Sequence, residues 1–150
     1  VGVSCQLLGI ERYTETEREL QKLHVKYGGQ ILSAEGIDPM ASNIAEYHHE
    51  RWDGRGYLKG LSGDAIPLEA RIVALVDVFD ALSSPRSYHE SLPFDKAFNQ
   101  VLDMAGTWFD PRLVLTFREC REEIRTIRDQ VNAREDLQKP FDFGLGATGT

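Results

Sequence analysis

The sequence predicts an all-α protein, a bundle of about five helices with one long loop after the second helix. Apolar residues recur at the helical spacing of three and four along most of the chain, and no segment alternates with the period of two that a strand requires. Glycines gather over residues 53–66, where the helical pattern stops, and this cluster predicts the loop.

The first helix is expected from Thr14 to about Ala34. Thr14 is followed three residues later by Glu17, which is the spacing of a capping box at a helix start. His24 lies inside this helix, one residue away from its apolar stripe. Residues 1–13 are expected to be extended or irregular. The stripe that predicts the buried face consists of Leu20, Leu23, Tyr27, Ile31 and Leu32.

A second helix is expected to begin at Pro39, because proline is favoured in the first turn of a helix. Two adjacent histidines, His48 and His49, stand near its C-terminal end. On a regular helix adjacent side chains diverge by about 100°, so one imidazole could face the core and the other the solvent. At a helix end the backbone is less regular, and both imidazoles can then turn toward one metal cluster.

Residues 53–66 are expected to form a functional loop rather than a disordered one. Loops of this length in compact domains are usually one or the other, and the aromatic residues Trp52 and Tyr57 can anchor this one. Pro67 predicts the start of a third helix. The expected buried stripe of this helix consists of Leu68, Ile72, Leu75, Val76, Phe79 and Leu82.

A fourth helix is expected over residues 94–105, and a fifth begins at Pro111 with Asp110 as its cap. The fifth helix is expected to reach Val131. Its apolar residues alternate by four and three, in a short heptad seam made of Leu113, Phe117, Cys120, Ile124, Ile127 and Val131. So short a seam is more typical of a helix that packs on its own core than of a dimer zipper. A homodimer through this seam is the alternative.

Composition predicts one domain over residues 1–135 and a flexible tail over 136–150. The net charge of −7 argues against DNA as a partner, because phosphate-backbone binding needs a basic face. No apolar run approaches the ~20 residues that a membrane span requires. Cys5 and Cys120 are far apart and are expected to be reduced thiols, which indicates a cytoplasmic protein.

Two carboxylates, Asp77 and Asp80, lie three residues apart beside the apolar stripe of the third helix. A carboxylate at such a place is unfavourable unless it is paired, hydrogen-bonded or bound to a metal. Asp80 is equally well explained as the structural partner of Arg71 or Arg86. Imidazoles with one carboxylate suit zinc, iron or manganese rather than calcium. The candidate metal ligands are His24, His48, His49 and Asp77.

A long stretch of the chain resembles the HD-GYP domains of bacteria. Residues 48–58 read His-His-Glu-Arg-Trp-Asp-Gly-Arg-Gly-Tyr-Leu, which is similar to the signature loop of that family. The similarity continues through residues 60–64, 66–74 and 77–82, and it covers roughly residues 14–117. HD-GYP domains are all-α members of the HD phosphohydrolase superfamily, so the resemblance implies an HD-domain-like helical bundle with a GYP-type loop.

The resemblance also implies an activity and a site. HD-GYP domains hydrolyse cyclic di-GMP to pGpG and GMP at a centre of two or three metal ions, commonly iron or manganese. By resemblance, the metal ligands are His24, His48, His49 and Asp77. The residues on the substrate side are Asp53, Gly56, Tyr57 and Arg86, and Arg86 is the arginine expected to reach a phosphate. Such domains work in second-messenger signalling beside receiver, sensor or diguanylate cyclase domains.

The sequence also departs from the HD-GYP pattern. The His-Asp dyad that names the family, with the catalytic lysine, is expected just before Val1, so this chain alone is expected to be inactive and to hold metal weakly. Leu58 replaces the proline of Gly-Tyr-Pro, and His89 replaces a basic residue. Residues 5–13 lack the Lys-Pro-Gly turn expected before the first helix.

These departures leave two functional hypotheses. The first is a metal-dependent cyclic di-GMP phosphodiesterase whose dyad lies outside this sequence. The second is a catalytically silent module that binds a protein partner, such as a diguanylate cyclase domain, or a nucleotide without turnover. A His-Asp pair in the residues immediately preceding Val1 would favour the enzyme, and its absence there would favour the binding module.

Overall fold

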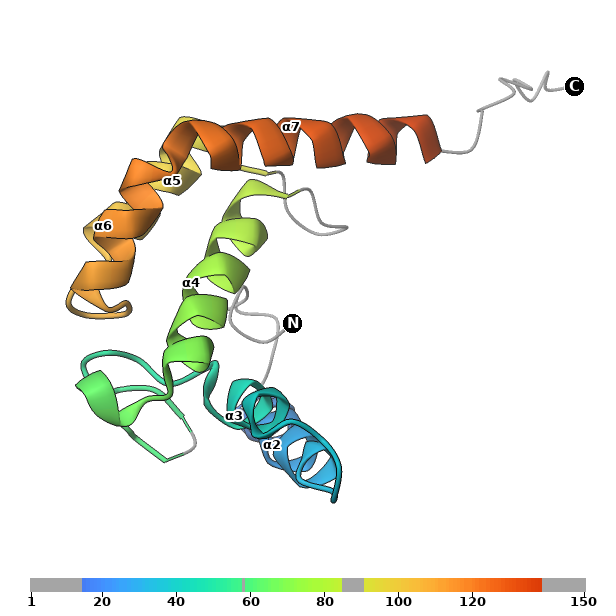
Figure 1. The fold of residues 1–150 in the computed structure, drawn as a ribbon, viewed down its shortest axis with the longest axis vertical. Helices are drawn as coiled ribbons and strands as arrows, with labels where there is room; N and C mark the ends of the chain where they lie inside the picture. Colours follow the sequence, from blue (N-terminus) through green and yellow to red (C-terminus); the bar gives the residue numbers. More distant parts are fainter. Residues whose placement is uncertain (1–14, 58, 85–90, 139–150) are drawn as a thin grey trace, which may run out of the picture. The chain divides into compact units, whose positions relative to one another are not determined.

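The protein is described by a computed structural model that covers residues 15–57, 59–84 and 91–138 (Figure 1). These residues form helices and connecting loops, without a named strand, and the all-α prediction is confirmed. The elements are α2 (Glu15–Leu32), α3 (Pro39–Tyr47), the short 3₁₀ turn η1 (Gly63–Ala65), α4 (Leu68–Ser83), α5 (Phe94–Asp103), α6 (Pro111–Glu119) and α7 (Arg121–Gln138). The predicted cap Thr14 and the irregular segment 1–13 lie outside the described residues.

The chain divides into two compact units, residues 1–118 and residues 119–150. Helices α2 to α5 and nearly all of α6 belong to the first unit, and α7 belongs to the second. The single helix predicted from Pro111 to Val131 is therefore wrong, because the chain turns at Cys120. The Cys120 carbonyl accepts a hydrogen bond from Ile124 N at 3.0 Å at the start of α7. No glycine or proline marks this break, so local propensity could not locate it.

Helix α2 packs against α3 through a face that the sequence did not predict. Val25 is fully buried on α2, and a β-carbon at Gly29 would lie 3.1 Å from Cγ of Glu46 on α3. The glycine therefore allows the two helices to approach closely. Two residues of the predicted stripe face the solvent instead, since Tyr27 is 55% exposed and Ile31 is 71% exposed. The apolar pattern identified the helix correctly but not its buried side.

Helix α3 is short and ends immediately before the paired histidines. Asp38 caps its N-terminus, because its Oδ1 accepts a hydrogen bond from Met40 N at 2.9 Å. The last helical residue is Tyr47, and His48 takes the C-cap position. His48 and His49 therefore follow the helix, where the backbone is free to leave helical geometry and both rings can face one place.

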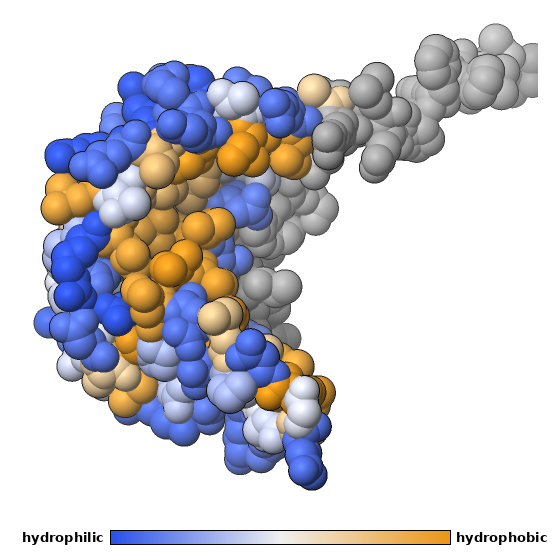
Figure 2. Space-filling model, viewed as in Figure 1, coloured by the Kyte–Doolittle hydropathy of each residue, from blue (hydrophilic) through white to orange (hydrophobic). Residues whose placement is uncertain are grey.

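Helix α4 is the central helix of the first unit and packs against α3 and α5. Leu75, Phe79 and Leu82 are buried, as predicted. The other members of the predicted stripe are at least 44% exposed: Leu68, Ile72 and Val76. Figure 2 shows apolar surface along this helix. The apolar residues of α4 surround most of its circumference, so periodicity alone could not select the buried side.

Four phenylalanine rings form the core where α4, α5 and α6 meet. Phe79 of α4 lies 5.3 Å from Phe117 of α6 and 5.7 Å from Phe94, measured between ring centroids. Phe98 of α5 stacks on Phe117 with 4.8 Å between centroids. All four rings are buried. Aromatic pairs at such distances are each worth about 0.5–1.5 kcal/mol beyond the area that they bury.

Candidate metal centre

Three of the four predicted ligands come together from two helices. His24 projects from α2, and His48 and His49 lie just beyond the end of α3. His24 Nε2 and His49 Nε2 are 3.1 Å apart, and the ring centroids of His48 and His49 are 3.9 Å apart. One ring nitrogen from each residue lies within 4.8 Å of the others, so this cluster could hold a metal ion.

The orientation of His48 fits a metal ligand. Its Nδ1 lies 2.8 Å from the carbonyl oxygen of Ile44, one turn back in α3. Because a carbonyl can only accept, Nδ1 carries the proton and Nε2 keeps its lone pair. Metal-bound histidines usually donate their other ring N–H to a carbonyl or carboxylate in this way. Two imidazole nitrogens bound to one metal at about 2.1 Å would be roughly 3.0–3.4 Å apart, for angles between about 90° and the tetrahedral value, and the separation of 3.1 Å between His24 and His49 lies in this range.

Burial keeps the two adjacent histidines neutral. It lowers the pKa of His48 below its ordinary value, and it lowers the pKa of His49 to about 2, with a smaller contribution from the neighbouring histidines. A protonated imidazole cannot bind a metal, so neutral rings at neutral pH are what a metal centre requires. The donor set thus fits a borderline divalent metal ion.

Asp77 lies on α4 beside this cluster, and its side chain is half-buried. Its negative charge raises the pKa of His48, against the larger effect of burial, and it also raises the pKa of Tyr57. Its carboxylate is not part of the compact group that the three histidines form in the described part of the chain. The structure therefore brings Asp77 near the histidines without placing it among them.

Tyr57 and Gly56 hold the glycine-rich loop against the histidines. The Tyr57 ring lies 4.9 Å from the His49 ring, and Tyr57 N donates to the His49 carbonyl oxygen at 3.3 Å. Burial raises the pKa of the Tyr57 phenol, so it stays protonated. A β-carbon at Gly56 would lie 2.5 Å from Arg51 N, which only glycine avoids. Both residues thus have structural reasons to be there, and their predicted contact with substrate stays a prediction.

Both carboxylate oxygens of Asp53 accept hydrogen bonds from residues of the loop itself. Its Oδ2 accepts a hydrogen bond from Arg51 Nη2 at 2.6 Å, and its Oδ1 accepts one from Arg55 N at 3.0 Å. Its own amide donates to the carbonyl oxygen of Thr107 at 2.9 Å. Asp53 therefore shapes the loop and ties it to the segment between α5 and α6. The last predicted substrate residue, Arg86, lies outside the described residues.

Sequence reasoning missed several residues around the centre. A cavity of about 60 Å³ adjoins the histidines, and its wall includes Glu50, Arg51, Arg55, Trp108 and Phe109. Arg51 lies over the Trp108 ring, with 4.0 Å from Cζ to the ring centroid. The position of Arg55 between two glycines could have signalled an exposed cation. Nothing in the sequence joins Trp108 to a loop more than forty residues away.

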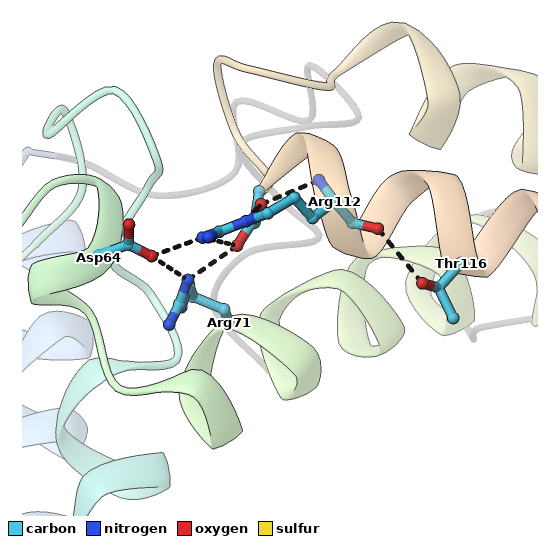
Figure 3. Close-up of polar contacts among 5 residues, drawn as sticks. Asp64, Arg71, Arg112 and Thr116 are labelled. Atoms are coloured by element: carbon cyan, nitrogen blue, oxygen red, sulfur yellow. Dashed lines mark hydrogen bonds and ion pairs between the residues drawn. The ribbon is translucent and has the colours of Figure 1, made fainter.

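An ion-pair network, buried at Asp110 and exposed at Asp64 and Arg112, anchors the far end of the loop (Figure 3). Arg71 of α4 donates to Asp64 at 2.9 Å and to Asp110 at 2.7 Å. Arg112 binds the same two carboxylates, and it meets Asp110 through two nitrogens. Asp110 Oδ1 also accepts from Arg112 N at 2.9 Å, which confirms the predicted cap of α6. The network joins η1, α4 and α6.

This network corrects one predicted alternative. The carboxylate partners of Arg71 are those of the loop and of the α6 cap, and Asp80 is not one of them. Asp80 instead accepts a hydrogen bond from the Ser84 hydroxyl at 2.8 Å, at the end of α4. The other predicted partner of Asp80, Arg86, is outside the described residues.

The structure thus combines an all-α fold with a cluster of one histidine inside α2 and two just beyond α3. The chain belongs to the HD domain family, whose model matches residues 6–113. Among curated relatives, it is 43% identical over 126 residues to a cyclic di-GMP phosphodiesterase response regulator of Xanthomonas campestris pv. campestris, with 83% of this chain and 33% of that protein covered.

Other relatives are named as phosphodiesterases of two different cyclic dinucleotides. The chain is 38% identical to a cyclic di-GMP phosphodiesterase of Thermotoga maritima, with 76% of this chain and 32% of that protein covered. It is 40% identical to a 3'3'-cGAMP-specific phosphodiesterase of Vibrio cholerae, with 75% and 22% covered. The crystal structure of a cyclic GMP-AMP specific phosphodiesterase of V. cholerae has a TM-score of 0.58 and 25% identity, with 79% of this chain and 31% of that chain covered.

The chain thus spans about a third or less of the length of these relatives. Among the helices that the structure describes, none is both long and apolar enough to cross a bilayer.

Proposed function

We propose that this chain is the metal-binding part of an HD-GYP phosphodiesterase that hydrolyses cyclic di-GMP to pGpG and GMP. The observation that carries the proposal is the convergence of three imidazoles, one from α2 and two just beyond α3, with the tautomer of His48 set by a backbone carbonyl. The proposed ligands of two or three iron or manganese ions are His24, His48, His49 and Asp77. Similarity to named cyclic dinucleotide phosphodiesterases supports the substrate class.

Bound divalent metals would activate a water molecule as the nucleophile and neutralise charge on the phosphoryl oxygens. The residues of this chain hold the ligands in place. His48 presents Nε2 because its Nδ1 proton is engaged by α3, and Tyr57 covers one side of the His49 ring. Gly56 lets the loop close directly onto the backbone that follows His49.

Substrate recognition is proposed for the open side of the same centre. Arg86 is proposed to bind a phosphate, and Asp53, Gly56 and Tyr57 to form the edge of the substrate site. The guanidinium of Arg55 is exposed beside the cavity at the histidines, which suits a second contact to a phosphodiester. Since phosphates occur in both cyclic di-GMP and cyclic GMP-AMP, these contacts do not distinguish the two.

The proposal is tested with the full-length protein, loaded with manganese or iron and incubated with cyclic di-GMP. We expect pGpG and GMP as products, and we expect His49→Ala to abolish turnover and metal retention. Lys96→Ala, on the exposed surface of α5, is the matched control and should behave as the wild type. Metal bound at full stoichiometry without turnover would favour the second hypothesis, a silent module that binds a partner or a nucleotide.

The remaining expectations from the sequence stay predictions. They concern the domain boundary near residue 135, a cytoplasmic location, a homodimer, and association with a receiver, sensor or diguanylate cyclase domain. The flexible tail predicted over 136–150 overlaps the end of α7 at Gln138, and its remainder lies outside the described residues.

A further inference from the structure

Glu50 is a buried carboxylate that follows His49 directly. It is 4% exposed, although glutamate is rarely buried without partners. Its Oε1 accepts hydrogen bonds from Lys59 N at 2.7 Å and from Gly60 N at 3.1 Å. Its Oε2 is buried and has no hydrogen-bond partner among the residues that the structure describes. One oxygen therefore holds the loop, and the other is available for a different contact.

His49 has a complementary unsatisfied atom. Its side chain is 5% exposed, and its Nδ1 is buried without a partner in the described part of the chain. Leaving a buried polar atom without a hydrogen bond costs about 1–3 kcal/mol. In the neighbouring His48, Nδ1 donates a hydrogen bond to the Ile44 carbonyl oxygen at 2.8 Å. His49 lies beyond the end of α3, and its Nδ1 has no such bond to a carbonyl of that helix.

The cavity at the histidines supplies room for a bridge. Its volume is about 60 Å³, and its wall includes His49, Glu50 and Arg51. Arg51 Nε is a third buried atom for which the described residues, 15–57, 59–84 and 91–138, supply no partner. A polar cavity needs about 10–15 Å³ to hold a water molecule, which typically makes 2–4 hydrogen bonds. In donor and acceptor character, the three atoms suit one shared water, which would accept from His49 Nδ1 and Arg51 Nε and donate to Glu50 Oε2.

We propose that Glu50 is a positioning residue for the metal centre and acts on His49 through this water. The bridge keeps the proton on His49 Nδ1 and leaves the lone pair on Nε2, the atom that faces His24 at 3.1 Å. Both adjacent histidines then share one tautomer, His48 by a direct bond to a carbonyl and His49 by a water-mediated bond to a carboxylate. This inference rests on the metal site of the proposed function.

The test replaces the carboxylate by an amide in the full-length protein. Glu50→Gln keeps the size of the side chain and an acceptor for the amides of Lys59 and Gly60, but its amide group no longer accepts from the water. We expect the affinity for Co²⁺ to fall about 10–100-fold, the range for lost outer partners of metal-bound histidine. Nitrogen NMR of the metal-free variant should show the His49 proton redistributed between the two ring nitrogens.

Glu46→Gln is the matched control, because Glu46 is a carboxylate of α3 that pairs with Lys59 Nζ at 3.0 Å on the more exposed side of the same loop. It should bind Co²⁺ as the wild type does. Wild-type affinity and an unchanged His49 tautomer in Glu50→Gln would overturn the inference. If His48→Ala also leaves Co²⁺ binding intact, the proposed function fails with it.

A second measurement uses the wild-type protein, so it does not depend on whether a variant folds. In a high-resolution crystal structure of the wild-type protein, we expect an ordered water within hydrogen-bond distance of both His49 Nδ1 and Glu50 Oε2. A dry cavity, or a direct protein partner for either atom, would contradict the water bridge.

Discussion

At the scale of single residues, Gly56 shows how closely the loop is fitted to the backbone beside the histidines. A β-carbon there would lie 2.5 Å from Arg51 N and 2.6 Å from the His49 carbonyl oxygen, so backbone would have to move to admit it. We expect Gly56→Ala to lower the free energy of unfolding by about 1–3 kcal/mol, the range for overpacking. Urea unfolding measures this loss.

The matched control for that change is another glycine. A β-carbon at Gly28 would lie 3.4 Å from Ala45 Cβ, which is an ordinary contact, and Gly28 is inside α2. Gly28→Ala should therefore be neutral or stabilise the protein by about 0.5–1 kcal/mol. An equal loss of stability in both variants would show that the close approach at Gly56 is not the cause.

Asp110 makes stability depend on pH. Hydrogen bonds from Arg112 hold the pKa of this carboxyl below its ordinary value, despite the opposing effect of burial. A group whose pKa is lower in the folded state contributes stability above its unfolded pKa of about 3.9, and that contribution disappears as the pH falls through the folded pKa. We expect Asp110→Asn to cost about 1.5–3 kcal/mol at neutral pH, the range for hydrogen bonds to charged groups, because Arg71 keeps Asp64 as a partner and Arg112 is largely exposed.

The difference in unfolding free energy between the wild type and Asp110→Asn should then shrink as the solution is acidified from about pH 6 to about pH 3. Denaturant titrations over this range measure it. Asp103→Asn, on the exposed surface of α5, is the control and should have little effect at either end. A difference that stays constant with pH would argue that Asp110 acts through shape rather than charge.

At the scale of elements, α3 carries the two adjacent histidines, and its N-terminal cap is the part of it easiest to test. The Asp38 side chain accepts from Met40 N, so Asp38→Ala leaves that amide without its acceptor. We expect a loss of about 1 kcal/mol in the free energy of unfolding. The control is Ser42→Ala, because the Ser42 hydroxyl donates a long hydrogen bond of 3.3 Å to the Pro39 carbonyl oxygen. This change should alter the free energy of unfolding by less than about 0.5 kcal/mol.

At the scale of the whole molecule, a metal at the three histidines would tie α2 to the end of α3. A ligand that binds only the folded state stabilises it, by about 2.7 kcal/mol at a concentration one hundred times its Kd. We therefore expect saturating Co²⁺ to raise the Tm of the full-length protein and to have a much smaller effect on His24→Ala. Calorimetry with and without a chelator measures both shifts.

The sequence by itself determined the local features of this protein. The helix starts at Pro39, Pro67 and Pro111 and the cap Asp110 were predictable, because each depends on residues a few positions apart. The structure brings the three histidines together, and the sequence offered grounds to expect this, since the adjacency of two of them and the signature loop beside them are visible along the chain. Their role as metal ligands stays a proposal.

Only the tertiary structure decided which surfaces meet. It exposed Ile72 and Val76 of α4, broke the last predicted helix at Cys120, and gave Arg71 its partners in the loop and the α6 cap. It also buried Glu50 and brought it into the wall of the same cavity as His49. Spacing along the chain specifies the period of a helix, whereas a contact between distant segments depends on how whole helices pack, which no local pattern records.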